Sequence, residues 1–265
     1  MAPEPLMTTD LSCQHNEADA IMLLEESLPL DPLDQPYYDA VADACGSDAS
    51  PVFCMRLARA YRSEKKAVRM GKTVAEAKKV MEWRLEHRAD TILGVELDKT
   101  HLFRQSWPTA LCGEDYYGHV VSVERAVDID LATFQSKFTV NEVLVHRLQH
   151  LERIQAQYDQ TCMSHVIVLI SRVTHLTPTV IGYIQPLFAL GQQYYPESLF
   201  RMYLVNAPFV FWGAWKVLSA LIDPDTRDKI QIFTSPAKFC TAAQAQGIPL
   251  TSIPTSLGGL HAAPT

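Results

Sequence analysis

The sequence lacks the features that mark several large classes of protein. No apolar run approaches the ~20 residues that a bilayer-spanning helix needs. Residues 1–17 have neither a basic start nor an apolar stretch, so we expect no secretory signal. The 6 cysteines are scattered and form no C-x-x-C pair, which favours reduced thiols over a disulfide framework.

A basic excess and the common catalytic motifs are also missing. The formal net charge is −7, which argues against a general nucleic-acid partner. The chain has no G-x-S-x-G, no Walker A sequence and no G-x-G-x-x-G. We therefore expect neither an enzyme nor a bound cofactor or metal.

The chain has enough apolar residues to build a sizeable core. It has 265 residues, of which 48% are hydrophobic and 20% charged. Its composition divides it into an acidic, partly disordered segment (1–50), with a short helix expected over 20–28, and a helical subdomain (51–90). The main domain (91–260) and a short tail (261–265) follow.

In the main domain, strand and helix patterns alternate. We expect strands over 119–125, 166–170, 202–205 and 230–233. Helices are expected over 139–158, 178–195 and 208–221, with further helix starts at Asp223-Pro224 and Ser235-Pro236. This alternation predicts an α/β fold with a mostly parallel sheet and crossover helices, preceded by the small helical subdomain.

Three residues of the helix expected over 139–158 have the spacing of metal ligands. Glu142, His146 and His150 recur every four residues and share one face. Zinc could bind there, but the H-E-x-x-H order is absent and no neighbouring cysteine completes a set. We expect a solvated helix face instead.

The segment 208–221, PFVFWGAWKVLSAL, is apolar almost all the way round. It is too short to span a membrane. Exposing its large aromatic side chains to water would forgo roughly 1.5–3 kcal/mol each. Two interpretations remain open from composition: a helix buried in the core, or one that meets a lipid.

The residues around this segment resemble the CRAL-TRIO lipid-binding domain of the yeast phosphatidylinositol/phosphatidylcholine transfer protein type. The matching motifs are Tyr195-Pro196-Glu197, Asn206-Ala207-Pro208-Phe209, Asp223-Pro224 with Thr226, and Lys229-Ile230. The resemblance extends over about 55–260. It implies a sheet that forms the floor of an apolar pocket, and a gating helix after Asn206-Ala207-Pro208-Phe209.

The resemblance also implies which residues contact the lipid. The headgroup residues are Arg59, Glu197, Asp223 and Lys229. The lid and acyl-chain pocket comprise Phe209, Phe211, Trp212, Trp215, Leu218, Val166, Val168 and Ile170. Arginine is suited to a phosphodiester because its planar fork can bind two oxygens at once.

Two positions depart from the family pattern. Ala60 occupies the place of a headgroup lysine beside Arg59. Val166 and Val168 stand where phosphatidylcholine-binding members carry hydroxyl side chains, which argues against phosphatidylcholine as a ligand. A loss of one cation weakens the expected phosphoinositide affinity.

We thus expect a monomeric cytoplasmic protein that binds and transfers phosphatidylinositol through transient membrane contact. Two alternatives stay open. One is a carrier of a phosphate-free ligand such as a sterol, retinoid or tocopherol. The other is an interaction module with a collapsed pocket.

Overall fold

A mostly parallel sheet forms the centre of the molecule. The computed structural model describes residues 30–158, 165–170, 178–208 and 211–262. Within them, the sheet has five strands in chain order: β1 (Thr109–Glu114), β2 (Val120–Glu124), β3 (His165–Ile170), β4 (Leu199–Val205) and β5 (Ile230–Phe233). The pairs from β2 to β5 are parallel, as predicted, whereas β1 pairs antiparallel with β2 and was not predicted.

The helices begin where short-range sequence signals place them. They are α2 (Gln35–Cys45), α3 (Pro51–Ala60), α4 (Lys66–Glu86), α5 (Thr100–Ser106), α6 (Leu131–Lys137), α7 (Val140–Tyr158), α8 (Pro178–Tyr194), α9 (Phe211–Leu218), α10 (Pro224–Asp228) and α11 (Pro236–Ala245). The Thr139–Glu142 capping box starts α7, with the Thr139 N–H donating to the Glu142 carboxylate. Ser235 caps α11 through the Lys238 N–H.

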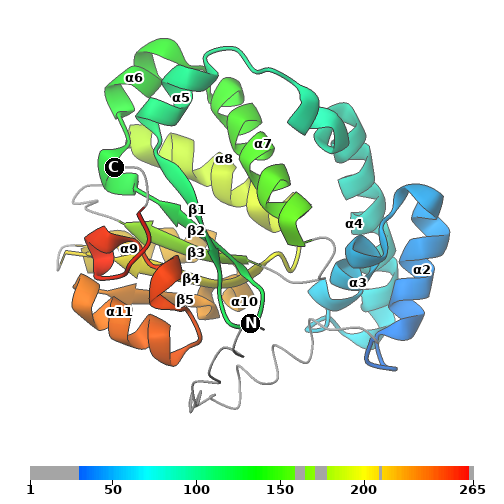
Figure 1. The fold of residues 1–265 in the computed structure, drawn as a ribbon. Helices are drawn as coiled ribbons and strands as arrows, with labels where there is room; N and C mark the ends of the chain where they lie inside the picture. Colours follow the sequence, from blue (N-terminus) through cyan, green and yellow to red (C-terminus); the bar gives the residue numbers. More distant parts are fainter. Residues whose placement is uncertain (1–29, 159–164, 171–177, 209–210, 263–265) are drawn as a thin grey trace, which may run out of the picture.

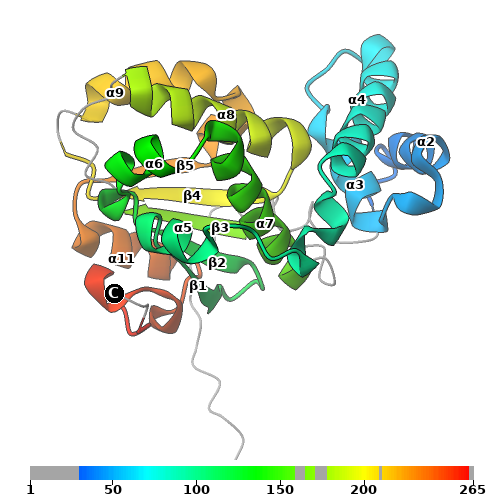
Figure 2. The same cartoon turned by 90° about the horizontal axis from the view of Figure 1, so that it is seen from above.

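Helices cover the two faces of the sheet unequally. On one face, α11 packs over β4 and β5 through Phe239 and Ala243, in a cluster with Tyr203 and Val205. On the opposite face, α7 covers β2 and α9 covers β4 and β5. Figure 2 shows α8 and α9 on one side of the sheet and α11 with the C-terminal segment on the other.

Three N-terminal helices form a separate group at one end of the molecule. Helices α2, α3 and α4 lie together in both views (Figures 1 and 2). They share a small core that includes Val41, Leu57 and Ala77. Helix α2 lies within the segment 1–50 and was not predicted, whereas the helix expected over 20–28 lies outside the described residues. In the described part of the chain, no helix is long and apolar enough to cross a bilayer.

Candidate functional site

The predicted headgroup residues Glu197 and Lys229 meet at the amino edge of the parallel strands. Glu197 precedes β4 and Lys229 precedes β5, so the parallel pairing of these strands brings the two side chains together. The Lys229 Nζ lies 3.0 Å from Glu197 Oε2, and both side chains keep some exposure to solvent, 18% and 34%. An accessible charged pair can donate to a phosphate and accept from hydroxyl groups.

The backbone around the pair is shaped by local turn chemistry. Glu197 adopts φ 50°, in the left-handed region, where a non-glycine residue carries a cost of roughly 1–2 kcal/mol. Asp223, another predicted headgroup residue, caps α10 by accepting from the Thr226 N–H at 2.8 Å. Lys229 ends the same short helix. The Asp223 cap therefore fixes where the helix begins, and Lys229 stands at its opposite end.

Aromatic stacking from the N-terminal region holds the loop that carries Glu197. The ring of Trp83 in α4 stacks on Tyr194, with centroids 4.0 Å apart and planes 12° apart. Trp83 also stacks on His87 at 4.6 Å and meets the ring of Tyr195 edge-on at 6.4 Å. Tyr194 stands only three residues before Glu197, so this stack restricts the position of the headgroup loop.

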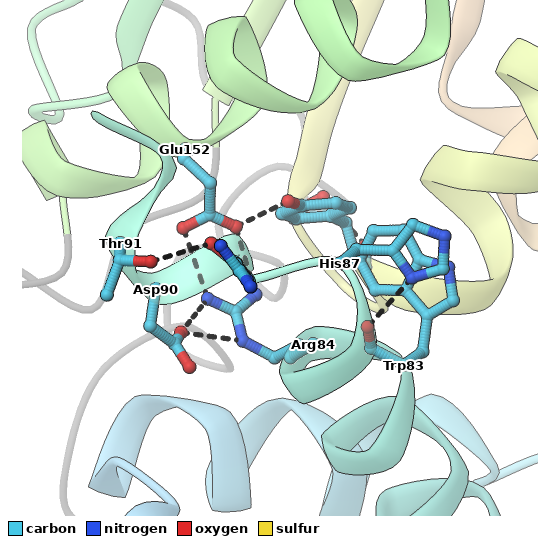
Figure 3. Close-up of polar contacts among 9 residues, drawn as sticks. Trp83, Arg84, His87, Asp90, Thr91 and Glu152 are labelled. Atoms are coloured by element: carbon cyan, nitrogen blue, oxygen red, sulfur yellow. Dashed lines mark hydrogen bonds and ion pairs between the residues drawn. The ribbon is translucent and has the colours of Figure 1, made fainter. Parts of the chain in front are cut away.

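A buried ion-pair network supports the same loop (Figure 3). Arg84 donates to both carboxylate oxygens of Glu152, at 3.0 and 3.1 Å, and also pairs with Asp90. The Tyr195 hydroxyl donates to Glu152. Burial alone would lower the pKa of Arg84, but the hydrogen bonds and charge of Glu152 raise it. The network joins α4, α7 and the Tyr195-Pro196-Glu197 motif, and the sequence gives no local signal for this pairing.

The remaining headgroup candidate, Arg59, lies in the N-terminal helical group. It is buried near the end of α3, with 9% of its surface exposed. Arg56, one turn earlier, lies close enough to His165 at the start of β3 to contribute to lowering its pKa, after the larger effect of burial. Helix α3 thus faces the edge of the sheet at which Glu197 and Lys229 lie. The role of Arg59 in headgroup binding stays a prediction.

Helix α9 is apolar on both its buried and its exposed sides. Phe211 and Leu218 are buried, and Phe211 packs with Leu204 of β4. Trp215 is partly buried against the same cluster. Trp212 and Val217 are exposed to solvent by 48% and 51%. Phe209 lies outside the described residues. One side of the helix therefore belongs to the core, whereas contact of the other side with a lipid stays a prediction.

Val166 and Val168, two of the predicted pocket residues of β3, lie on the face of the sheet opposite to α9. Val166 and Val168 are fully buried in the cluster beneath α11, on the face away from α9. Leu169 packs in the α9 cluster, and Ile167 shares its face by strand alternation. Ile167 pairs with Met202 of β4, and both are only partly buried. Sequence analysis missed Ile167 and Met202. The side chain of Ile170 lies outside the described residues.

The helix face formed by Glu142, His146 and His150 is not solvated, contrary to the prediction. His146 and His150 are each only 8% exposed. His146 stacks on Phe103 at 4.3 Å and hydrogen-bonds with the Asp98 carbonyl oxygen, while Glu142 pairs with Lys99. Packing by a distant segment, not metal binding, explains their burial. Among the described residues, no group of side chains is arranged to hold a metal ion.

Comparison with known proteins assigns the family. The family model of the CRAL/TRIO domain matches residues 104–259, more than half of the chain. The chain therefore belongs to the CRAL/TRIO domain family. The crystal structure of Sfh5 superposes with a TM-score of 0.60 at 19% identity, covering 77% of this chain and 70% of that one, which supports the fold alone.

Curated relatives share about a quarter of their aligned residues with this chain. The Sec14 cytosolic factor of Schizosaccharomyces pombe is 25% identical over 192 residues, covering 68% of this chain and 66% of the relative. A phosphatidylinositol/phosphatidylcholine transfer protein of Arabidopsis thaliana, SFH14, is 26% identical over 73% of this chain and 35% of its own length. The chain thus spans between a third and two thirds of the length of these relatives.

Proposed function

We propose that this chain binds a phospholipid, with phosphatidylinositol as the first candidate, and transfers it between membranes. The observation that carries the proposal is the half-exposed apolar helix α9, which presents Trp212 and Val217 to solvent beside a sheet whose Ile167 and Met202 are incompletely covered. The acyl chains would lie between this sheet face and α9, and the exposed side of α9 would enter the membrane interface. The relatives named as transfer proteins support this function.

The Glu197–Lys229 pair is the proposed headgroup site. Lysine donates to the phosphodiester, which keeps its negative charge at neutral pH, and the carboxylate of Glu197 accepts from inositol hydroxyl groups. Binding and release involve no covalent chemistry. The free energy comes from removing acyl chains from water and from the charged hydrogen bonds of the headgroup.

The test compares phosphatidylinositol transfer between vesicles by the wild type and a Lys229→Met variant. A lost hydrogen bond to a charged group weakens binding about tenfold or more, so we expect a comparable fall in transfer. Lys238→Met is the matched control, since Lys238 is exposed on α11 and lies across the sheet from α9. Unchanged transfer in the Lys229 variant would refute the headgroup site.

Native mass spectrometry of the purified protein identifies the ligand independently. A bound mass that matches phosphatidylinositol supports the proposal. A bound sterol or another phosphate-free ligand would be consistent with α9 as a lid but would contradict the assignment of Glu197 and Lys229 to the headgroup. A protein that stays empty after exposure to mixed vesicles would favour an interaction module.

A further inference from the structure

A cavity lined by basic side chains lies away from the Glu197–Lys229 pair. It has a volume of about 610 Å³ and is formed by α5, β1, the end of β2, α7 and residues 254–256. Figure 1 places α5 beside the upper part of α7, near β1. The basic residues that line the cavity are Arg104, Arg125, Arg147, Arg153, His101, His146 and His150. Among the described residues, no Asp or Glu lines it, although the chain has a net charge of −7.

Two of these arginines have no carboxylate partner among the residues that the structure describes. Arg147 pairs with Glu124 at 2.6 Å, and Arg125 pairs with Asp128. Arg104 and Arg153 form no ion pair with any residue that the structure describes. Burial and then repulsion by Arg104 lower the pKa of Arg153, although an arginine stays protonated in proteins. The cavity thus holds two like charges that repel one another.

Two hydrogen-bond donors are buried in the cavity wall without a protein acceptor. The guanidinium of Arg147 lies 4.6 Å from the centroid of the Trp107 ring. The Nη1 of Arg147 and the Nε1 of Trp107 are buried and find no partner within the described chain. Arg147 itself is only 8% exposed. A buried donor without an acceptor is destabilising, so an anionic ligand that accepts from both would remove this cost.

Two of the histidines that line the cavity, His146 and His150, do not add to its positive charge at neutral pH. Burial, followed by the charges of Arg147 and Arg153, holds the pKa of His150 well below its ordinary value. Burial is also the main cause that lowers the pKa of His146. Both rings are therefore neutral near pH 7 and add no charge to that of the arginines.

The cavity and the Glu197–Lys229 pair lie at opposite edges of the sheet. Arg125 follows the carboxyl end of β2, whereas Glu197 and Lys229 precede the amino ends of β4 and β5. A parallel strand of five residues spans roughly 17 Å. One phosphate cannot contact both places. The carboxyl edge is also where open α/β sheets most often bind their ligands.

We propose that this arginine-lined cavity binds a phosphate monoester. Such a group carries a charge of about −1.5 to −2 at pH 7, which matches the two arginines that lack partners. Its oxygens suit the fork of a guanidinium. Phe103, Pro108 and Ala110 supply an apolar wall for the organic part of the ester. A cationic choline headgroup is repelled by the same arginines.

The direct test is calorimetric titration of the full chain with glycerol 3-phosphate. Dimethyl phosphate, a singly charged diester, is the ligand control and is expected to bind at least about tenfold more weakly. Arg104→Gln and Arg153→Gln should each weaken glycerol 3-phosphate binding about tenfold or more. Arg227→Gln is the matched control, because Arg227 is exposed on α10 and does not line the cavity, so its loss should leave glycerol 3-phosphate binding unchanged.

Further measurements distinguish a ligand site from a cluster of arginines that only supports the fold. If either Gln variant fails to fold, Arg153→Lys keeps the charge, removes the fork and should still weaken binding. A thermal melt of Arg153→Gln should show no loss of stability, because the substitution removes like-charge repulsion. Lower stability with unchanged binding would assign the arginines to packing and overturn the proposal.

Short-chain phosphatidic acid distinguishes a lipid headgroup from a soluble ester. Binding at least about tenfold tighter than that of glycerol 3-phosphate would identify a lipid source, and equal binding a soluble one. Either result supports the phosphate site. If neither glycerol 3-phosphate nor phosphatidic acid binds the wild-type protein, the proposal is wrong. Phosphatidylinositol transfer is measured separately, so its failure does not affect this outcome.

Discussion

The two faces of the sheet are covered by helices that differ in composition and in packing. Helix α11 is less apolar, yet Phe239 is completely buried beneath it. Helix α9 is more apolar, yet Trp212 is 48% exposed. Apolar content alone therefore does not tell how far a helix is buried. The proposed membrane contact of α9 would account for its larger number of exposed apolar side chains.

The faces also differ in the polar groups that they bury. Beneath α7, the sheet carries Ser122 and Glu124, which contact His150 and Arg147. His165 lies on the same face at the start of β3 and is 3% exposed. The face beneath α11 carries the largest apolar cluster among the described residues. One face is therefore packed mainly by apolar side chains, and the other combines apolar packing with buried polar contacts.

The largest expected contrast is in folding stability. Phe239→Ala should lower the free energy of unfolding by about 3–5 kcal/mol, because it leaves a cavity in the core. Trp212→Ala on the opposite face should lower it by only about 0.5 kcal/mol, since half of that side chain is already exposed. Urea denaturation measures the free energy of unfolding of both variants. Equal losses would show that α9 and α11 contribute equally to stability and would contradict the contrast.

A second contrast lies in the pH dependence of stability. Burial, then the charge of Arg56, lowers the pKa of His165 to about 4 in the folded chain. Since the unfolded value is about 6.5, protonation favours unfolding. The contribution of His165 is fully present above pH 6.5 and is lost as the pH falls towards 4. The loss is on the order of 3 kcal/mol.

Urea denaturation across this range of pH checks the prediction in the wild type and in His165→Asn. The variant should lose less stability on acidification than the wild type does. Phe239→Ala, which changes no titratable group, serves as the control and should keep the wild-type pH dependence. A His165 variant with the wild-type slope would assign the acid sensitivity to other groups.

The smallest expected effect is on membrane association. Trp212→Glu should weaken binding to phospholipid vesicles about tenfold or more, because a charge replaces an aromatic side chain that would enter the interface. Trp212→Phe should retain most of the binding. Vesicle sedimentation measures both variants. Trp212 is a better target than Trp215, which also packs against the sheet. Equal binding by the Glu and Phe variants would contradict a membrane role for α9.

Short-range chemistry made much of the fold predictable. The start of α7 follows from the Thr139–Glu142 capping box, and the starts of α10 and α11 follow from Asp223-Pro224 and Ser235-Pro236. These signals depend on contacts within three residues, so they survive any tertiary context. The pairing of Glu197 with Lys229 followed from the family resemblance, because no local pattern joins residues so far apart.

Long-range packing explains what the sequence did not reveal. Residues 166–170 form an uninterrupted apolar run, and such a run does not indicate which side chains face which layer. In the structure, Val166 and Val168 face α11, while Ile167 lies on the other face of the sheet. His146 is buried because Phe103, from a distant segment, stacks on it. The arginine-lined cavity likewise assembles from α5, α7 and the C-terminal segment.

The Arg84–Glu152 network has a practical consequence for anyone who wishes to produce the CRAL/TRIO domain alone. The matched family domain begins at residue 104, so a fragment cut there omits both Trp83 and Arg84. Glu152 would then remain in the interior without its cation, and Tyr194 would lose its stacking partner. A minimal fragment that keeps the loop of Glu197 in place must therefore begin before α4, so the functional unit extends beyond the family boundary.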